Sequence, residues 1–351
     1  MIDEAPRRVI STPIQIGSTP LETPLGIAPM AGMTDSAFRR LVKGHGGCGL
    51  VVTEMVSSEG LIRGIDRTLE YAEYTDEERP VSIQIFGGDP DKMAEAARIV
   101  EGMGADIVDV NMGCPVPKIA KHNAGCSLMR EPEHAARVIA SMTRAVSIPV
   151  TVKMRAGWND SDRNAPTLAR MVEDAGARAV TVHGRTAAQS YTGSADWDIV
   201  AEVADLLTIP VFGSGDCVTP EQILERLQSG VEGVLVGRGV LRNPWILAQA
   251  ADLMAGRPAR EVTRRDRGQF LLDYIELLRH ERVRDAPSSH ERWMVNKIRA
   301  LGSWYTKGIE GGSALRTGLN SADTVDAVRA IIHEGFFNTD RSCQLVDIAA
   351  S

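Results

Sequence analysis

Eight short apolar runs, separated by stretches with helical periodicity, constrain the fold of this chain more than any other feature of its sequence. The runs are rich in Val and Ile and are bounded by Gly or Pro, as expected for strands that are buried on both faces of a parallel sheet. They are Leu25–Met30, Gly49–Met55, Val81–Phe86, Asp106–Asn111, Val150–Arg155, Ala179–His183, Ile209–Gly213 and Gly233–Arg238. Eight such strands alternating with helices predict an α/β fold, a (β/α)₈ TIM barrel.

Helical patterns lie between most of these runs and continue after them. In Pro90–Met103 and Pro132–Val146 apolar residues recur at helical spacing, with charges on the opposite face. After Pro244 no further strand pattern occurs, and three more helical stretches follow in 270–278, 293–305 and 324–332. We therefore expect a catalytic barrel domain over residues 14–250 and an all-α helical bundle domain over residues 255–337, followed by a loose tail.

Composition limits the cellular setting. The chain has 351 residues, of which 43% are hydrophobic, enough to bury a large core. No uninterrupted apolar run of ~18 residues occurs and the first residues lack an apolar signal core, so neither a membrane span nor export is predicted. The five cysteines are scattered and odd in number, which indicates neither a disulfide framework nor a CxxC metal site. A reducing cytoplasm is expected.

Charge is distributed unevenly along the chain. The net charge is −7, yet residues 257–316 contain 13 Lys and Arg against 8 Asp and Glu. The other residues contain 26 basic and 38 acidic groups. This asymmetry indicates either an anionic partner for the C-terminal segment or a solvated helical surface.

The active site of a TIM barrel lies at the carboxyl ends of its strands, and this rule selects candidate residues directly. Polar or reactive side chains occur there in the third to sixth strands and the loops after them. They are Gln84, Asn111, Cys114, Lys153, Arg155 and His183. The first strand ends in Pro29, Met30 and Ala31, and the last two are followed by Ser214-Gly215-Asp216 and Gly237-Arg238.

The two glycine turns favour a phosphate site. Glycine permits close approach of backbone N–H groups, and the start of a following helix favours negative charge. Barrel phosphate sites often lie after the seventh and eighth strands, where these turns fall. Tight turns also need glycine for their own geometry, but Arg238 would add a guanidinium fork for a phosphate.

Lys153 and Gln84 are interpreted as partners of an electron-rich ring. A lysine inside a strand is costly to bury alone, so Lys153 either reaches solvent or supplies a cation to a ring or a phosphate. A reduced flavin gathers negative charge at one edge of its ring and would be stabilised by such a cation. Gln84 would bond the same ring edge, or is a strand amide that backbone groups satisfy.

His183 and Cys114 each have a structural and a chemical interpretation. His183 can donate to a flavin, a phosphate or a substrate carbonyl, although a single histidine at a strand end is more often structural. Cys114 lies in a loop at the catalytic rim, where a cysteine can act as nucleophile or proton donor. We interpret the other barrel cysteines, Cys48, Cys126 and Cys217, as packing residues.

A series of motifs runs through the barrel in a fixed order. They are Ala28-Pro29-Met30-Ala31-Gly32-Met33-Thr34-Asp35 with Phe38-Arg39, Asn111-Met112-Gly113-Cys114-Pro115 with Lys118, Val152-Lys153-Met154-Arg155 with Gly157-Trp158, and Val182-His183-Gly184-Arg185-Thr186. In order and spacing they resemble the tRNA-dihydrouridine synthases, and most of all their bacterial B-type branch. The similarity covers the barrel over residues 14–245 and, more loosely, the helical part.

This resemblance implies FMN as the prosthetic group, NADPH as the reductant and tRNA as the substrate. By position it implies that reduced FMN delivers a hydride to C6 of a D-loop uridine and that Cys114 protonates C5. Positions near the uracil correspond to Asn111 and Arg155. Flavin-contacting positions correspond to Pro29, Met30, Ala31, Gln84, Lys153, His183, Ser214, Gly215, Asp216, Gly237 and Arg238. A cytoplasmic monomer is expected, with no metal and no membrane partner.

The implied chemistry suits these residue types. Reduction of the 5,6 double bond creates enolate character at O4 and C5, so the site needs hydrogen-bond donors at the carbonyls and an acid over C5. The target base must leave its stack to reach a flavin. The helical domain is expected to bind the tRNA body through its phosphates.

The chain departs from the family pattern at two places. Ser214 stands where the family usually has Asn, which removes a side-chain amide contact. Ala300-Leu301 stands where related bacterial sequences carry Lys-His. Arg299 remains, and Lys297, one turn earlier, is expected to compensate as a tRNA contact.

Two other functions fit parts of the pattern. A dihydroorotate dehydrogenase-like enzyme would share FMN, the barrel and a cysteine that acts on a pyrimidine, but it would not require a basic helical tail. A non-catalytic RNA-binding protein that retains a flavin fold would not need Cys114 for its function.

Overall fold

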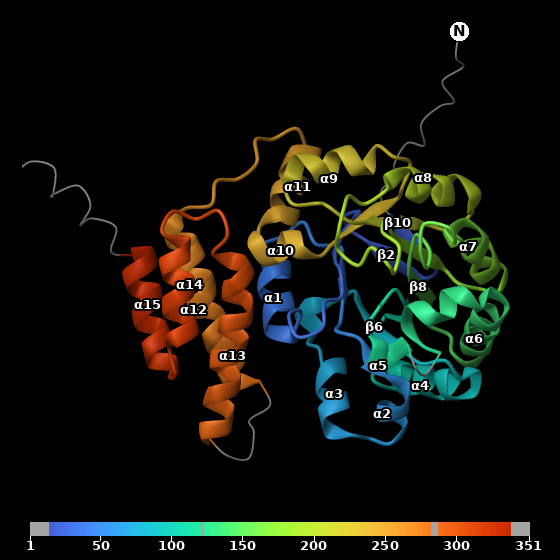
Figure 1. The fold of residues 1–351 in the computed structure, drawn as a ribbon, viewed down its shortest axis with the longest axis horizontal. Coiled ribbons are helices and arrows are strands. Elements are labelled where there is room, and N and C mark those ends of the chain that lie inside the picture. Colours follow the sequence, from blue (N-terminus) through green and yellow to red (C-terminus); the bar gives the residue numbers. More distant parts are fainter. Residues whose placement is uncertain (1–13, 121–122, 282–286, 338–351) are drawn as a thin grey trace, which may run out of the picture.

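The computed structural model describes residues 14–120, 123–281 and 287–337 (Figure 1). Predictions about the first residues, the C-terminal tail and Cys343 lie outside this described part. Within it, none of the helices combines the length and the apolar character that crossing a membrane requires.

A closed parallel barrel forms the larger part of the molecule, so the predicted TIM-barrel fold is confirmed. Its strands are β3 (Leu25–Ile27), β4 (Leu50–Val52), β6 (Val81–Phe86), β7 (Ile107–Met112), β8 (Val150–Arg155), β9 (Ala179–His183), β10 (Val211–Ser214) and β11 (Gly233–Val236). Each lies within or beside one of the predicted runs. Pairing of β4 with β6, in which Val51 lies opposite Val81, closes the ring. A short strand, β5 (Val56–Ser57), extends the pairing along β6.

Helices cover the outside of the barrel. They are α1 (Ser36–Gly44), α2 (Ser58–Ile62), α3 (Asp66–Ala72), α4 (Pro90–Gly102), α5 (Pro117–Ala120), α6 (Pro132–Ala145), α7 (Ala165–Asp174), α8 (Trp197–Leu206), α9 (Pro220–Leu227), α10 (Arg238–Arg242) and α11 (Ile246–Met254). Several begin with proline, whose missing N–H is harmless in the first turn. In α9 Pro220 follows the N-cap Thr219, which forms a capping box with Gln222. These local signals explain why the predicted helical stretches begin at the first residues of α4 and α6.

An N-terminal hairpin, which the sequence analysis did not predict, closes the amino-terminal end of the barrel. It consists of β1 (Ile14–Ile16) and β2 (Thr19–Leu21), paired antiparallel. Its apolar side chains form one cluster with Leu50, Ile107 and Ala179, which are the first residues of β4, β7 and β9. The functional site must therefore open at the opposite, carboxyl end.

Four C-terminal helices, coloured orange to red in Figure 1, form a bundle beside the barrel near α1. They are α12 (Arg264–His280), α13 (Pro287–Tyr305), α14 (Gly312–Ser321) and α15 (Val325–Phe337). The sequence analysis missed α14, in which two glycines lower helix propensity. Phe38 of α1 packs edge-on against Phe270 and Tyr274 of α12. The apolar core consequently continues from the barrel into the bundle.

Candidate active site

A cavity of about 530 Å³ lies at the carboxyl end of the barrel. Side chains and turns that follow β3, β6, β7, β8, β9, β10 and β11 line it. Every residue selected from the sequence lies on its wall: Pro29, Met30, Ala31, Gln84, Asn111, Cys114, Lys153, Arg155, His183, Ser214, Gly215, Asp216, Gly237 and Arg238. The structure thus gathers all of these residues at one place, as barrel topology requires.

The loop after β7 presents the Cys114 thiol to the cavity. The amide oxygen of Asn111 accepts hydrogen bonds from the backbone N–H groups of Gly113, at 3.1 Å, and Cys114, at 2.9 Å. The carbonyl of Cys114 accepts from the N–H of Cys126 at 3.1 Å. Burial raises the pKa of the Cys114 thiol. At neutral pH the sulfur therefore carries its proton, as an acid must and a thiolate nucleophile does not.

Asn111 and Gln84 form a buried amide pair behind this loop. Nδ2 of Asn111 donates to Oε1 of Gln84 at 2.7 Å. Gln84 is fully buried in the cavity wall. The side-chain amide of Gln84 thus bonds to other side chains, so the alternative in which backbone groups satisfy it is wrong.

Arg155, the last residue of β8, links the loop after β7 to the loop after β9. Its Nε donates to the carbonyl of Gly113 at 2.7 Å, and Nη1 donates to the carbonyls of Thr186 and Ser190 at 2.9 Å each. Burial lowers the pKa of Arg155, although a guanidinium retains its charge at physiological pH. Arg155 therefore fixes the cysteine loop while keeping a cation beside it.

Lys153 supplies a cation to the cavity wall from within β8. Among the described residues, none accepts a hydrogen bond from its ammonium group. Burial lowers the pKa of Lys153 to about 8, with Arg155 acting in the same direction. A buried lysine whose ammonium group donates to no acceptor among the described residues is suited to an electron-rich ligand group.

His183 is neutral and has a defined tautomer. The N–H of Arg185 donates to Nδ1 of His183 at 3.1 Å, so the ring proton must be on Nε2. Burial lowers the pKa of His183 to about 2, and the nearby Lys153 and Arg155 act in the same direction. His183 consequently offers an N–H donor at the cavity wall, not a titrating base.

The turns after β10 and β11 shape the far end of the cavity. Gly215 has a φ of +126°, and a Cβ there would lie 2.6 Å from Cβ of Ala195, so glycine is required. The carboxylate of Asp216 accepts from Arg185 at 2.8 Å and from Arg238 at 3.2 Å. Asp216 therefore orients Arg238, and its backbone is the part available to a ligand.

Two aromatic residues of the cavity wall were not selected from the sequence. Tyr191 is 57% exposed, and its ring lies under the guanidinium groups of Arg155, at 5.8 Å, and Arg238, at 4.8 Å. Trp304 comes from α13, so the helical bundle completes the cavity wall. Neither residue lies at the end of a strand or in a recognised short motif, so the sequence alone did not indicate it.

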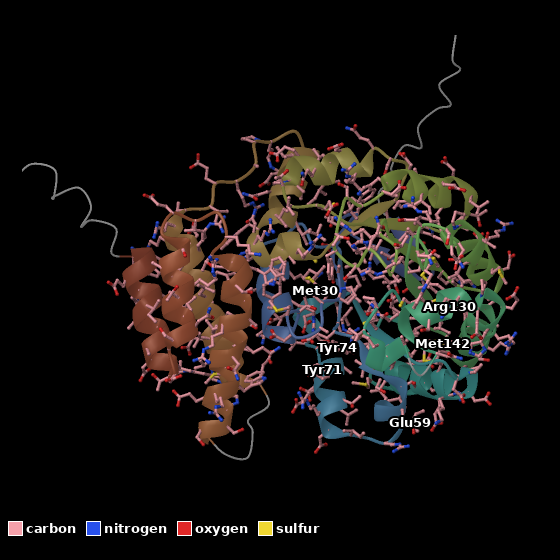
Figure 2. All side chains as sticks on the ribbon, in the orientation of Figure 1. Met30, Glu59, Tyr71, Tyr74, Arg130 and Met142 are labelled. Atoms are coloured by element: carbon pink, nitrogen blue, oxygen red, sulfur yellow. The ribbon has the colours of Figure 1, made fainter. Side chains whose placement is uncertain are left out.

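A second cavity, also of about 530 Å³, lies between the barrel and the bundle. Figure 2 shows Tyr71 and Tyr74 on its barrel side, at α3 and the segment after it, and Trp293 and Lys297 of α13 contribute to its wall. Charged and aromatic side chains of both the barrel and the bundle therefore line this second cavity.

Lys297 is not free to contact RNA, contrary to the sequence-based expectation. Only 14% of its side chain is exposed. Its Nζ lies 2.9 Å from Oδ2 of Asp35 and 3.7 Å from Oε1 of Glu54. Arg299 likewise bonds the carbonyl of Ala322 at 2.7 Å and the carboxylate of Asp323 at 3.1 Å. Lys297 is therefore engaged inside the protein, whereas Arg299 keeps 30% of its side chain exposed.

Comparison with known proteins gives a consistent result. The family model described as "Dihydrouridine synthase (Dus)" matches residues 26–338. A protein named tRNA-dihydrouridine synthase B, from Xanthomonas axonopodis pv. citri, is 37% identical over 324 residues, covering 92% of this chain and 96% of that protein. A probable tRNA-dihydrouridine synthase from Rickettsia conorii is 44% identical over 238 residues, covering 67% and 72%. A similarly named protein from Synechocystis is 34% identical over 348 residues, covering 98% and 95%.

Proposed function

This chain belongs to the dihydrouridine synthase family, and we propose that it reduces the C5–C6 double bond of specific uridines in the D-loop of tRNA. The observation that carries the proposal is the position of Cys114 in the same cavity as Lys153 and His183, on a loop whose backbone is fixed by Asn111 and Arg155. Membership of this family favours tRNA over orotate as the substrate.

The residues of the cavity fit FMN. Lys153 is a cation without a hydrogen-bond acceptor among the described residues, and Nε2–H of His183 is a neutral donor. The Gly215 turn brings backbone close to the cavity at a position where a side chain would clash. Lys153, His183 and the Gly215 and Gly237 turns would hold the flavin, with Arg238 toward its phosphate. When bound and reduced by NADPH, FMN supplies the hydride that C6 of the uracil receives.

Cys114 supplies the proton in this proposal. After C6 has gained a hydride, the electron pair of the former double bond lies at C5 and O4 of the uracil. The S–H bond of Cys114 breaks, its proton forms the new C–H bond at C5, and a thiolate remains. Burial raises the pKa of Cys114, and the charge of Arg155 offsets part of that rise and so stabilises the thiolate, which then regains a proton from water.

The bundle is proposed to bind the body of the tRNA. Residues 257–316, which run from just before α12 into α14, contain 13 Lys and Arg against 8 Asp and Glu, and phosphate contacts position a nucleic acid without reading its sequence. Trp304 brings α13 to the cavity itself. The uridine would therefore enter at the junction of barrel and bundle.

The test is to supply purified protein with FMN, NADPH and tRNA lacking dihydrouridine, and to measure dihydrouridine in the product. Mapping the modified position in cells with and without the protein identifies the uridine. Formation of dihydrouridine only when all components are present is expected. Oxidation of NADPH that requires orotate, with tRNA unchanged, would contradict the proposal.

A further inference from the structure

A buried carboxylate lies directly behind the amide pair of the site. Asp109 is two residues before Asn111 on β7, so both side chains point to the same side of the strand. It is 5% exposed. Oδ1 of Asp109 accepts from the hydroxyl of Thr151 on β8 at 2.6 Å, and Oδ2 accepts from Nε2 of Gln84 on β6 at 2.7 Å.

These hydrogen bonds continue to the loop after β7, which carries Cys114. Gln84 donates to Asp109 with one end of its amide and accepts from Asn111 with the other, both at 2.7 Å. Asn111 in turn accepts from the N–H groups of Gly113 and Cys114. Four side chains on three neighbouring strands and two backbone N–H groups of the loop after β7 thus form one directed chain.

The direction of this chain depends on its first member. A carboxylate accepts hydrogen bonds and cannot donate them, whereas an amide has a donor end and an acceptor end. Facing Asp109, Gln84 must present its NH₂ group, so its oxygen faces Asn111. Asn111 must then present its NH₂ group to Gln84 and its oxygen to the cysteine loop. Reversed amides would place NH₂ of Asn111 against two backbone N–H donors.

We infer that Asp109 is a positioning residue for the proposed proton donor: through Gln84 and Asn111 it fixes the loop that presents the Cys114 thiol. The inference rests on the proposed function. Asp109 lines no part of the cavity and acts only through the two amides. Burial raises the pKa of Asp109, and the bonds from Gln84 and Thr151 and the charge of Lys153 offset part of that rise.

The variants separate the effect of the hydrogen-bond direction from the effect of the negative charge of Asp109. Asp109→Val removes the acceptor with a side chain that suits a strand. Asp109→Asn removes the charge but keeps the chain, because its oxygen can accept from Gln84 while its NH₂ group faces the hydroxyl of Thr151. Thr151→Val is the matched control, since it removes one bond to Asp109 and leaves the bond to Gln84.

Two measurements are made on each variant. In the loaded enzyme, uridine reduction in tRNA and anaerobic flavin reduction by NADPH are timed separately. In FMN-free protein, alkylation of Cys114 by iodoacetamide is followed by peptide mass spectrometry. We expect Asp109→Val to slow uridine reduction at least ~30-fold, since a positioned acid contributes ~10²–10⁴-fold. Its NADPH step should stay within about threefold, and its Cys114 should be alkylated several-fold faster because the loop is released. Asp109→Asn and Thr151→Val should remain within about threefold of the wild type in both measurements.

A double-mutant cycle tests the route through Gln84. In a Gln84→Met background, which removes the connecting amide, Asp109→Val should cause no further change in Cys114 alkylation. Equal effects of Asp109→Val in both backgrounds would overturn the inference, as would an Asp109→Asn protein as impaired as Asp109→Val. If Asp109→Val does not fold, Asp109→Ala replaces it in the same cycle. Because alkylation needs neither flavin nor tRNA, the inference can be decided even if the wild type reduces no uridine.

Discussion

Tyr274 of the bundle donates its buried hydroxyl to Oδ2 of Asp35 in the barrel, at 2.7 Å. The same oxygen lies 2.9 Å from Nζ of Lys297. The other oxygen of Asp35 accepts from the N–H of Phe38 in the first turn of α1, at 2.9 Å. One carboxylate thus connects α12, α13 and the helix that follows the first barrel strand, so the bundle and the barrel share a polar centre as well as an apolar core.

Lys297→Met should destabilise the protein by about 3 kcal/mol, because it leaves Asp35 and Glu54 buried without their shared cation. Unfolding by denaturant, with the bundle and the barrel followed by separate probes, measures the loss. Lys307→Met is the matched control, since Lys307 is exposed over the ring of Trp304. If Lys297→Met lowers the free energy of unfolding by less than about 1 kcal/mol, the ion pair contributes no more than one on the surface. That result would contradict a structural role for Lys297.

Glu281→Gln should raise stability above neutral pH and leave it unchanged in acid. Burial raises the pKa of Glu281 to about 7, and the charge of Asp35 acts in the same direction. The folded state therefore takes up a proton that the unfolded state has already lost, and wild-type stability falls as the pH rises from the ordinary glutamate pKa through about 7. Gln can still accept from the N–H of Ala37, as Glu281 does at 2.7 Å.

Thermal unfolding of both proteins from pH 5 to pH 8.5 tests this. The difference in melting temperature should be absent at the acid end and grow in favour of Glu281→Gln through neutrality. A difference of constant size across the range would show that the titration of Glu281 does not contribute.

Cys114→Ala should separate the two half-reactions of the proposed enzyme. Anaerobic flavin reduction by NADPH should proceed near the wild-type rate, while uridine reduction should slow by ~10²–10⁴-fold because the positioned acid is lost. Ser should recover little, because a hydroxyl is a much weaker acid than a thiol of reference pKa ~8.5. Cys126→Ala, a buried neighbour on the same loop, is the control. Loss of both half-reactions together would instead assign Cys114 to holding the cofactor.

Purified protein should be yellow, and heat should release FMN, because the cavity offers a cation and a neutral donor to a ring. Lys153→Met should keep the colour but make the flavin potential more negative, by roughly 30 mV for each tenfold loss of stabilisation of the reduced form. An unchanged potential would mean that Lys153 reaches solvent and does not face the ring. Recovery of FAD would contradict the assignment of the cofactor.

Much of the fold follows from repeated local signals. Buried parallel strands are continuous Val- and Ile-rich runs, so all eight barrel strands were predicted from such runs and the Gly or Pro residues that bound them. The hairpin of β1 and β2 was missed because its strands of three residues each are too short to show a period. The helix α14 was missed because its glycines obscure the Leu315 and Leu319 pair, which lies one turn apart on its buried face.

The site was predicted to the extent that barrel topology defines it. Residues at the carboxyl ends of strands must converge, so the position of Lys153 and His183 on one cavity wall follows from register. The roles of charged side chains did not follow in the same way. Lys297 was expected on the surface because the sequence does not show that Asp35 and Glu54, far away in the chain, meet it. Tyr191 and Trp304 enter the site through tertiary packing, which no local pattern encodes.

The hairpin at the amino-terminal end of the barrel has a kinetic consequence. Ile14, Ile16 and Leu21 close that end, so in the described part of the chain the cavity communicates with solvent from the strands' carboxyl side. In the proposed enzyme, a nicotinamide and a uracil that both react with the bound flavin would use this entrance in turn. We therefore expect the first product to leave before the second substrate enters, which is a ping-pong scheme. Each substrate at high concentration should accordingly inhibit competitively against the other, and double-reciprocal plots should be parallel when neither is in excess.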